Sequence, residues 1–307
     1  MKKPLTFKML LLVCLVAVVS CNSGPSSKPV DTSLSNGPEN GSLLVVGGNM
    51  RDTAIIMKFI ELAGGKDAPI VIIPTASGAE EFDEERVARL FTSAGATDVK
   101  VVHTYDTAVA NTDEFIEPII NAAGVWFNGG RQWRLVDAYG GTKAETEFRK
   151  VLERGGVIGG SSAGATIQGS YLARGDTKTN TIMMGDHESG FGYLANTAID
   201  QHLLVRNRQH DLVEVIRKHP SLLGIGLDEN TAIVVSGNEF EVMGESFVAI
   251  YDYSIWDENP YSEFRLPNQG KFFLLRSGDR YNLKTREVIS WSGGNTRNIF
   301  AETTEDN

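Results

Sequence analysis

Residues 157–165 read Val-Ile-Gly-Gly-Ser-Ser-Ala-Gly-Ala, an apolar pair followed only by small residues. This order predicts a short buried strand, a sharp turn and the start of a helix. Gly160, Ser162 and Gly164 have the Gly-x-Ser-x-Gly spacing, in which the glycines let neighbouring backbone pass close to a nucleophilic serine. We therefore interpret Ser162 as a candidate nucleophile, with a purely structural Ser/Gly-rich turn as the alternative. The amides at the start of the helix are then placed to donate to an oxyanion.

Apolar strands and helices alternate along the chain before this stretch. Strands are expected at 43–46, 70–73, 99–102, 125–127 and 157–158, with helices at 53–63, 81–94, 113–122, 132–139 and 142–154 between them. Continuous apolar strands separated by helices are typical of a parallel sheet with helices on both faces, so we predict an α/β fold. Shorter strands at 223–227, 231–236, 239–243, 247–251 and 272–275 predict antiparallel strands, added to the sheet or forming an edge subdomain.

Composition excludes several partners. The chain has 307 residues and a formal net charge of −10. It is long enough to bury a substantial core. An acidic surface repels phosphate backbones, so we expect no nucleic-acid partner. No His/Cys cluster has the spacing of metal ligands, so we expect neither a metal nor another cofactor.

The N-terminus has the pattern of an export signal. Three lysines precede the apolar run 9–19, which is too short to span a bilayer. The run leads to Val-Val-Ser-Cys21, which resembles the lipobox of bacterial lipoproteins, where the cysteine is acylated. The alternative is an ordinary signal peptide with an incidental cysteine. We expect an exported, membrane-anchored lipoprotein, periplasmic or at the cell surface, with its lipid on Cys21.

The expected organisation has three parts. Residues 1–20 form the signal peptide. Residues 21–41 are rich in Ser, Pro, Gly and Asn and poor in apolar residues, which predicts a flexible tether. Residues 42–307 form the catalytic domain.

A serine nucleophile needs a base, and His202 has the most suitable context among the five histidines. It follows Ile199-Asp200-Gln201, an apolar approach ending in polar residues, as expected of a strand that delivers side chains to the carboxyl edge of a sheet. In an extended segment Asp200 and His202 share one face. An acid to orient the base is expected in Asp228-Glu229, after the strand 223–227; a solvated turn is the alternative.

A further polar turn, Asn128-Gly-Gly-Arg-Gln132, lies at a strand-to-helix junction. Its glycines are candidates for directing a backbone N–H towards the oxyanion, and Gln132 is a candidate for contacting substrate. A tight turn with a capping asparagine is the alternative interpretation.

Together these motifs resemble the cyanophycinase group of the S51 serine peptidases, which is related to peptidase E. The resemblance covers residues 43 to about 251 and implies a Rossmann-like sheet of the class I glutamine amidotransferase type. Those amidotransferases use a cysteine at the turn, whereas both cysteines of this chain lie in or beside its signal region. The resemblance implies that Ser162 is the nucleophile, His202 the base and Glu229 the orienting acid. The oxyanion hole would be formed by the backbone of Gly130 and Ala163.

The same resemblance implies a pocket for a β-linked Asp-Arg unit, formed by Gln132, Asp200, Gln201, Arg206 and Arg208. One position departs from the group, because Asp211 stands where an arginine is expected. We expect Asp211 to pair with Arg208 or to face a substrate cation. A change from cation to anion alters which substrate carboxylates are tolerated.

The expected activity is therefore exopeptidase or isopeptidase hydrolysis of aspartyl or β-aspartyl bonds, with a cyanophycin-like substrate as one candidate. A homodimer is also implied.

Two other interpretations remain. An α/β-hydrolase esterase has the order Ser, acid, His, and no histidine follows His219 to serve it. A non-enzymatic binding lipoprotein explains the tether but not the Gly-x-Ser-x-Gly at a strand end.

Overall fold

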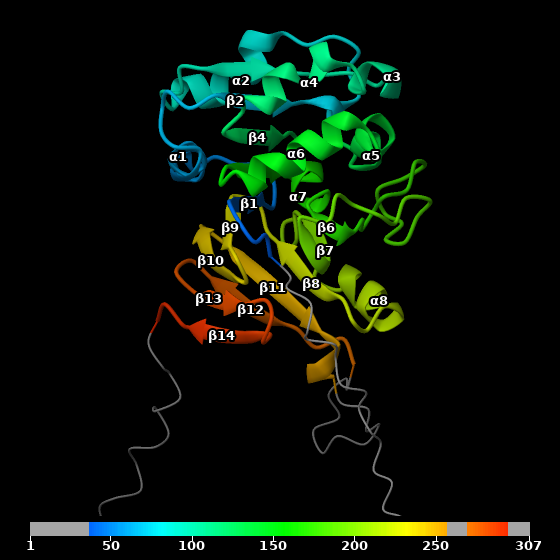
Figure 1. The fold of residues 1–307 in the computed structure, drawn as a ribbon. Coiled ribbons are helices and arrows are strands. Elements are labelled where there is room, and N and C mark those ends of the chain that lie inside the picture. Colours follow the sequence, from blue (N-terminus) through cyan, green and yellow to red (C-terminus); the bar gives the residue numbers. More distant parts are fainter. Residues whose placement is uncertain (1–36, 257–268, 294–307) are drawn as a thin grey trace, which may run out of the picture.

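The computed structural model describes residues 37–256 and 269–293 (Figure 1). The predicted signal peptide, Cys21 and most of the predicted tether lie outside the described residues. The last part of that tether, residues 37–41, packs against the domain. Pro38 is buried, and the Gly37 amide donates to Asn238 Oδ1 at 3.3 Å. The folded domain therefore includes these five residues, in addition to those predicted.

The larger sheet has nine strands in the order β14-β13-β10-β9-β1-β5-β4-β2-β3. Its parallel part consists of β1 (Ser42–Val46), β5 (Val157–Ser161), β4 (Gly124–Phe127), β2 (Ile70–Ile73) and β3 (Val99–Val101). The register pairs Val46 of β1 with Ser161, and Phe127 of β4 with Gly160. The carboxyl ends of three neighbouring strands therefore meet beside Ser162.

Helices cover both faces of this parallel part. Two neighbouring residues of β4 show which helices pack on which face. On one face the ring of Trp126 contacts Phe59 and Phe91. Those two phenylalanines belong to α1 (Thr53–Leu62) and α2 (Glu84–Ser93). The next residue, Phe127, points to the other face and contacts Phe148. That face carries α4 (Asp113–Ile120), α5 (Trp133–Tyr139) and α6 (Lys143–Glu153). Two short helices, η1 (Thr75–Ser77) and α3 (Thr107–Ala110), follow β2 and β3 along the chain.

Four antiparallel strands extend the larger sheet. This is one of the two predicted alternatives, in which the later strands are added to the sheet. They are β9 (Thr231–Ser236), β10 (Glu239–Gly244), β13 (Arg280–Asn282) and β14 (Glu287–Ser290). The strand β9 pairs with β1 and the others follow outward. The sequence analysis did not predict β13 and β14, which are short and half exposed.

A second sheet of five strands, in the order β12-β11-β8-β7-β6, lies beside the first. It consists of β6 (Gly169–Tyr171), β7 (Leu194–Gln201), β8 (Leu223–Leu227), β11 (Phe247–Asp252) and β12 (Phe273–Arg276). The one-turn helix α7 (Ala163–Thr166) leads into this sheet, while α8 (Asp211–Lys218) connects β7 to β8 and η2 (Tyr253–Ile255) follows β11. The prediction that β8 is antiparallel was wrong in part: α8 is a crossover, so β8 pairs parallel with β7 and antiparallel only with β11.

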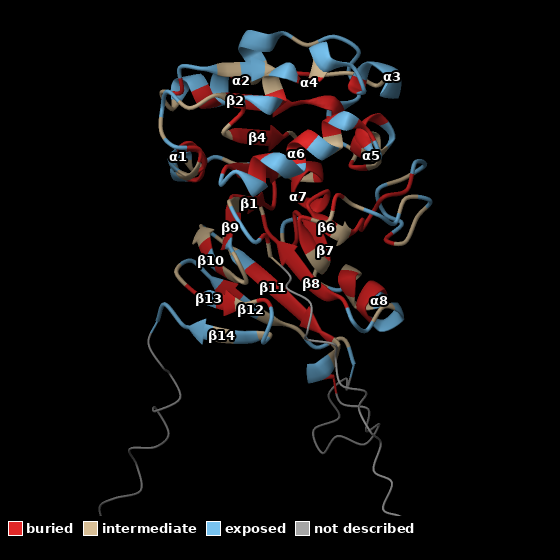
Figure 2. Ribbon diagram, in the orientation of Figure 1, coloured by how far each residue is buried: buried red, intermediate tan, exposed pale blue. Residues whose placement is uncertain are grey.

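Burial follows this architecture (Figure 2). The strands β2 and β4 are buried along their whole length, as continuous apolar strands between two helical layers should be. The strand β8 is buried throughout as well, because its apolar side chains share one core with strands of the larger sheet and α8 covers its other face. The edge strand β14 is mostly exposed. Within residues 37–256 and 269–293, no helix has the length and apolar character needed to cross a membrane.

Candidate active site

Ser162 lies in the turn between β5 and α7, with φ +58° and ψ −111°. Few non-glycine residues adopt a positive φ, and the surroundings hold this one in place. The Ser162 amide donates to Val46 O at 3.0 Å. A Cβ on Gly164 would lie 1.9 Å from Phe127 O, and one on Gly160 would lie 2.3 Å from Gly164 O. The two glycines of the motif are therefore required by close backbone approach, which is the steric reason predicted for them.

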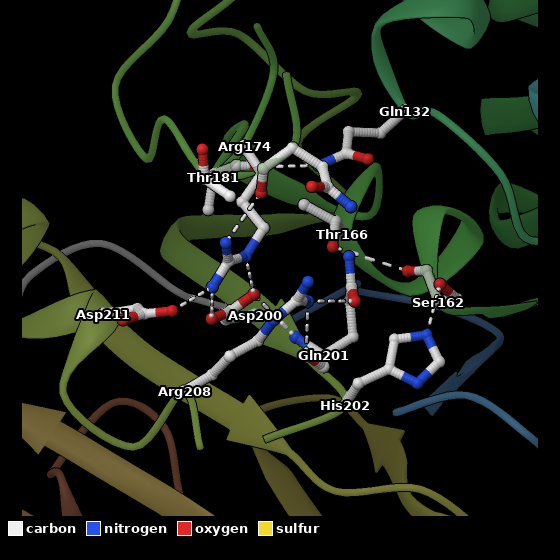
Figure 3. Close-up of polar contacts among 12 residues, drawn as sticks. Gln132, Ser162, Thr166, Arg174, Thr181, Asp200, Gln201, His202, Arg208 and Asp211 are labelled. Carbon is white, nitrogen blue, oxygen red and sulfur yellow. Dashed lines mark hydrogen bonds and ion pairs between the residues drawn. The ribbon is translucent and has the colours of Figure 1, made fainter. Parts of the chain in front are cut away.

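His202 follows the end of β7, and its imidazole points towards Ser162 (Figure 3). Its Nε2 lies 2.9 Å from Ser162 Oγ. Its backbone amide donates to Gly47 O at 2.9 Å. A Cβ on Gly48 would lie only 2.3 Å from the imidazole Cε1, so that glycine leaves the space that the ring occupies. The turn after β1 thus supports the histidine through both its backbone and its ring.

Glu229 follows β8 and contacts the far side of the imidazole. Its Oε1 lies 2.7 Å from His202 Nδ1, and its Oε2 accepts a hydrogen bond from Asn49 Nδ2 at 2.6 Å. The neighbouring Asp228 has a different task. It accepts from the amides of Leu204 and Val205 at 2.9 and 3.1 Å, which fixes the loop after the histidine.

One expectation about this site was wrong. Asp200 and His202 do not share a face, because His202 has φ +54° and leaves the strand alternation at the end of β7. The Asp200 carboxylate is fully buried and faces Arg174, with Oδ1 at 2.7 Å from Nε and Oδ2 at 3.0 Å from Nη2. The carboxylate that contacts the imidazole is that of Glu229.

The surroundings of the imidazole, and above all its burial, favour its neutral form. Burial lowers the pKa of His202, and the nearby Arg206 and Arg208 lower it further, which outweighs the hydrogen bond and charge of Glu229. Burial works against ionisation of Glu229, but its hydrogen bonds from Asn49 and His202 hold its pKa below the ordinary value. A neutral imidazole beside an ionised carboxylate is the state in which a histidine can accept a proton from a serine hydroxyl.

Free amides lie near the serine. Among the described residues, no backbone hydrogen bond uses the amides of Gly129, Gly130 or Ala163. Gly129 is the glycine that lies against the serine, since its Cβ would be 3.2 Å from Ser162 Cβ. Gly130 has φ +146° and packs on Ala76 O. The roles of the Gly130 and Ala163 amides stay predictions.

The predicted substrate residues form one polar cluster, at whose exposed side Arg206 lies near enough to act on Arg208 by its charge. Arg208 Nη1 donates to both oxygens of Gln201, to the backbone O at 3.0 Å and to Oε1 at 2.9 Å. Gln132 is buried, and its Nε2 donates to Ala173 O at 2.6 Å. Because Asp200 is fully buried, it fits a supporting role better than direct contact with substrate.

Arg174 belongs to this cluster and was missed by the sequence analysis. It lies in the connection between β6 and β7, in no recognisable motif, and its partners are 26 and 37 residues away along the chain. It also corrects the expectation for Asp211, which pairs with Arg174 and not with Arg208. The reason is that Arg174 enters the space between the two aspartates (Figure 3).

Comparison with known proteins gives consistent results. The family model of peptidase family S51 matches residues 43–243. A cyanophycinase from Geminocystis herdmanii is 31% identical over 265 residues, covering 81% of this chain and 96% of that protein. A cyanophycinase from Synechococcus elongatus is 31% identical over 264 residues, covering 81% of each chain.

Two solved structures share the fold. A peptidase from an acI-B1 actinobacterium has a TM-score of 0.58 at 22% identity, over 80% of this chain and 98% of that one. A putative peptidase E from Listeria monocytogenes has a TM-score of 0.50 at 18% identity, over 67% and 99%. The predicted α/β class, with a mostly parallel core and added antiparallel strands, is confirmed.

Proposed function

The chain belongs to peptidase family S51, and we propose that it is a serine-type peptidase that hydrolyses aspartyl or β-aspartyl peptide and isopeptide bonds. The observation that carries the proposal is a continuous chain of hydrogen bonds. Ser162 Oγ lies 2.9 Å from His202 Nε2, and His202 Nδ1 lies 2.7 Å from Glu229 Oε1. This is the spatial order of nucleophile, base and orienting acid in serine hydrolases.

The proposed reaction follows from that order. His202 removes the proton of Ser162 as Oγ attacks the substrate carbonyl, and the free amides near the turn stabilise the oxyanion. The imidazolium then gives this proton to the leaving amine, and the peptide bond breaks to leave an acyl-serine. Water, deprotonated by His202, hydrolyses the ester and restores the serine. Glu229 stabilises the imidazolium in both halves.

The chemistry of Arg208 supports an acidic substrate. Its side chain is 8% exposed, and Nη1 is held by Gln201. In the described part of the chain, Nε and Nη2 have no hydrogen-bond partner. A largely buried guanidinium with free donors is suited to a carboxylate, which it binds through its rigid fork. The two cyanophycinase relatives support the same substrate class.

The test is a substrate panel of α-linked and β-linked aspartyl dipeptides, cyanophycin, and the matching dipeptides in which the free aspartyl carboxylate is an amide (asparagine for the α-linked and isoasparagine for the β-linked peptides). Wild-type protein should cleave the aspartyl peptides and Ser162→Ala should cleave none. Arg208→Ala should lose the preference for aspartate over asparagine, because loss of one partner of a desolvated ion pair costs at least about tenfold in binding. Equal cleavage of aspartyl and asparaginyl peptides by wild type would contradict the substrate class.

We also propose that the protein is exported and anchored to a membrane through a lipid on Cys21. The support is the Val-Val-Ser-Cys21 junction and the polar segment after it. A net charge of −10 offers no basic patch for an anionic membrane, so attachment depends on the acyl chains. Cys21→Ser should move the protein from the membrane to the soluble fraction. A wild-type protein that is soluble and carries no acyl group by mass spectrometry would contradict the anchor.

A further inference from the structure

Arg174 is held in an unusual conformation. It has φ +58°, in the left-handed region, and its side chain is buried so that only 2% of the residue is exposed. Each property costs free energy, since an arginine is unfavourable in that backbone region and a buried guanidinium must be compensated. A position that glycine would fill without strain therefore holds a charged residue, which indicates that the guanidinium has a task there.

The guanidinium uses all three of its nitrogens on three different segments. Nε and Nη2 bind both oxygens of Asp200, at 2.7 and 3.0 Å, and Nη2 also binds Asp211 Oδ2. Nη1 donates to Asn180 O at 2.7 Å. Asp200 Oδ1 accepts in addition from the amide of Gln201 at 2.9 Å, so both of its oxygens are occupied. Figure 3 shows Arg174 between the two aspartates.

A second guanidinium lies beside the same carboxylate. Burial lowers the pKa of Arg208, the charge of Arg174 lowers it further, and the charge of Asp200 raises it, which places all three groups in one electrostatic cluster. Yet among the described residues Arg208 binds only the neutral oxygens of Gln201. Arg174 occupies both oxygens of the Asp200 carboxylate.

We propose that Arg174 is a positioning residue that keeps Arg208 available to the substrate carboxylate by occupying Asp200 and Asp211. Without Arg174, Asp200 is a buried carboxylate without its counter-ion. Arg208 is then the cation that compensates it, and pairing with Asp200 removes its free donors from the pocket. The inference rests on the proposed function and concerns how the carboxylate of the substrate is bound.

The experiment compares Arg174→Gln, Arg174→Lys and the double variant Arg174→Gln/Asp200→Asn with wild type. It measures kcat and KM on a β-aspartyl dipeptide and the rate at which a small uncharged fluorophosphonate labels Ser162. For Arg174→Gln we expect KM to rise at least about tenfold, because the ion pair with substrate is lost. The labelling rate should stay within about twofold of wild type, because the probe carries no carboxylate. Arg174→Lys should be intermediate, since an ammonium cannot span both oxygens of Asp200.

The double variant separates positioning from a merely structural role. Because Asp200→Asn removes the buried carboxylate that would capture Arg208 and leaves only the more exposed Asp211 unpaired, KM should return towards the wild-type value. A double variant no better than Arg174→Gln would overturn the proposal, as would an equal loss of labelling and peptide cleavage in both Arg174 variants. A wild type that is neither labelled nor active would remove the proposed function itself, and this inference with it. A labelled, active wild type with unchanged Arg174 variants would contradict this inference alone.

Discussion

Ser162 and His202 both have positive φ angles, +58° and +54°. Each such conformation costs of order 1–3 kcal/mol and persists only where the surroundings impose it. Here the same backbone turn imposes both: Val46 O holds the serine amide, and Gly47 O holds the histidine amide. The strain places the two side chains 2.9 Å apart, with no further rearrangement needed for proton transfer.

The pH dependence of catalysis tests the electrostatics of the base. His202 must be neutral to accept a proton, so activity should rise as pH increases through its pKa, which lies below the ordinary 6.5. Arg206 is exposed and lowers that pKa by its charge. Arg206→Ala should therefore move the acid limb of the kcat/KM profile, which reports the free enzyme, to higher pH, whereas Lys178→Ala, on the connection between β6 and β7, should leave it in place. An acid limb that does not move, or moves to lower pH, would contradict this account.

The orienting acid is tested by two amide substitutions. Glu229→Gln keeps a hydrogen-bonding partner but loses the charge that stabilises the imidazolium, so kcat should fall by roughly 10⁴, as when the acid of a serine triad is neutralised. Asp200→Asn should act mainly on KM, since Asp200 contacts Arg174 and not the imidazole. Steady-state kinetics on one peptide with both variants decides this. A larger kcat loss for Asp200→Asn would remove Glu229 from its proposed role.

At the scale of elements, the connection between β6 and β7 is anchored to α5 by a histidine. His187 Nε2 lies 2.8 Å from Asp137 of α5, and its Nδ1 lies 3.1 Å from Asp186. Burial lowers the pKa of His187, but the two carboxylates raise it more, so the net shift is upward. A raised pKa means that the charged contact is fully present below the ordinary value and is lost as pH rises through the folded-state pKa.

We therefore expect this connection to open more readily at alkaline pH. Limited proteolysis of residues 172–193 should increase as pH rises from about 6 to 8, near the ordinary titration range of histidine, and their amide protection, corrected for the intrinsic pH dependence of exchange, should decrease. His187→Gln should show the high-pH protection at both values, because its amide carries no charge. Corrected protection that is independent of pH in wild type would contradict the anchor.

Sequence patterns predicted the elements near the site better than the contacts between them. The apolar strand before Ser162 and the polar residues at the ends of the later strands are local signals, and the structure brings Ser162, His202 and Glu229 together. Arg174 had no local signal, because its role depends on aspartates far along the chain. The prediction that His202 shares a strand face with Asp200 was wrong, because the positive φ of His202 breaks the strand alternation on which that prediction depended.

At the scale of the whole molecule, the site lies where two sheets meet. Ser162 follows a strand of the nine-stranded sheet, whereas His202 and Glu229 follow strands of the five-stranded sheet. The turn after β1 joins them, since Gly47 O accepts from His202 and Gly48 O accepts from Asn230. The sequence did not predict this division, because apolar strands look alike whichever sheet they join. The relative position of Ser162 and His202 therefore depends on how the two sheets pack, which neither predicted alternative, strands added to the sheet or an edge subdomain, specified.

The most direct measurement is covalent labelling with a fluorophosphonate, followed by intact and peptide mass spectrometry. The account predicts one adduct per chain, located on Ser162. Ser162→Ala should prevent the adduct and lower peptide hydrolysis roughly a millionfold, as loss of a triad nucleophile does, while the matched Ser161→Ala keeps both. A wild-type protein that hydrolyses aspartyl peptides without an adduct on Ser162, or a Ser162→Ala variant within about tenfold of wild-type activity, would contradict the central claim that Ser162 is the nucleophile.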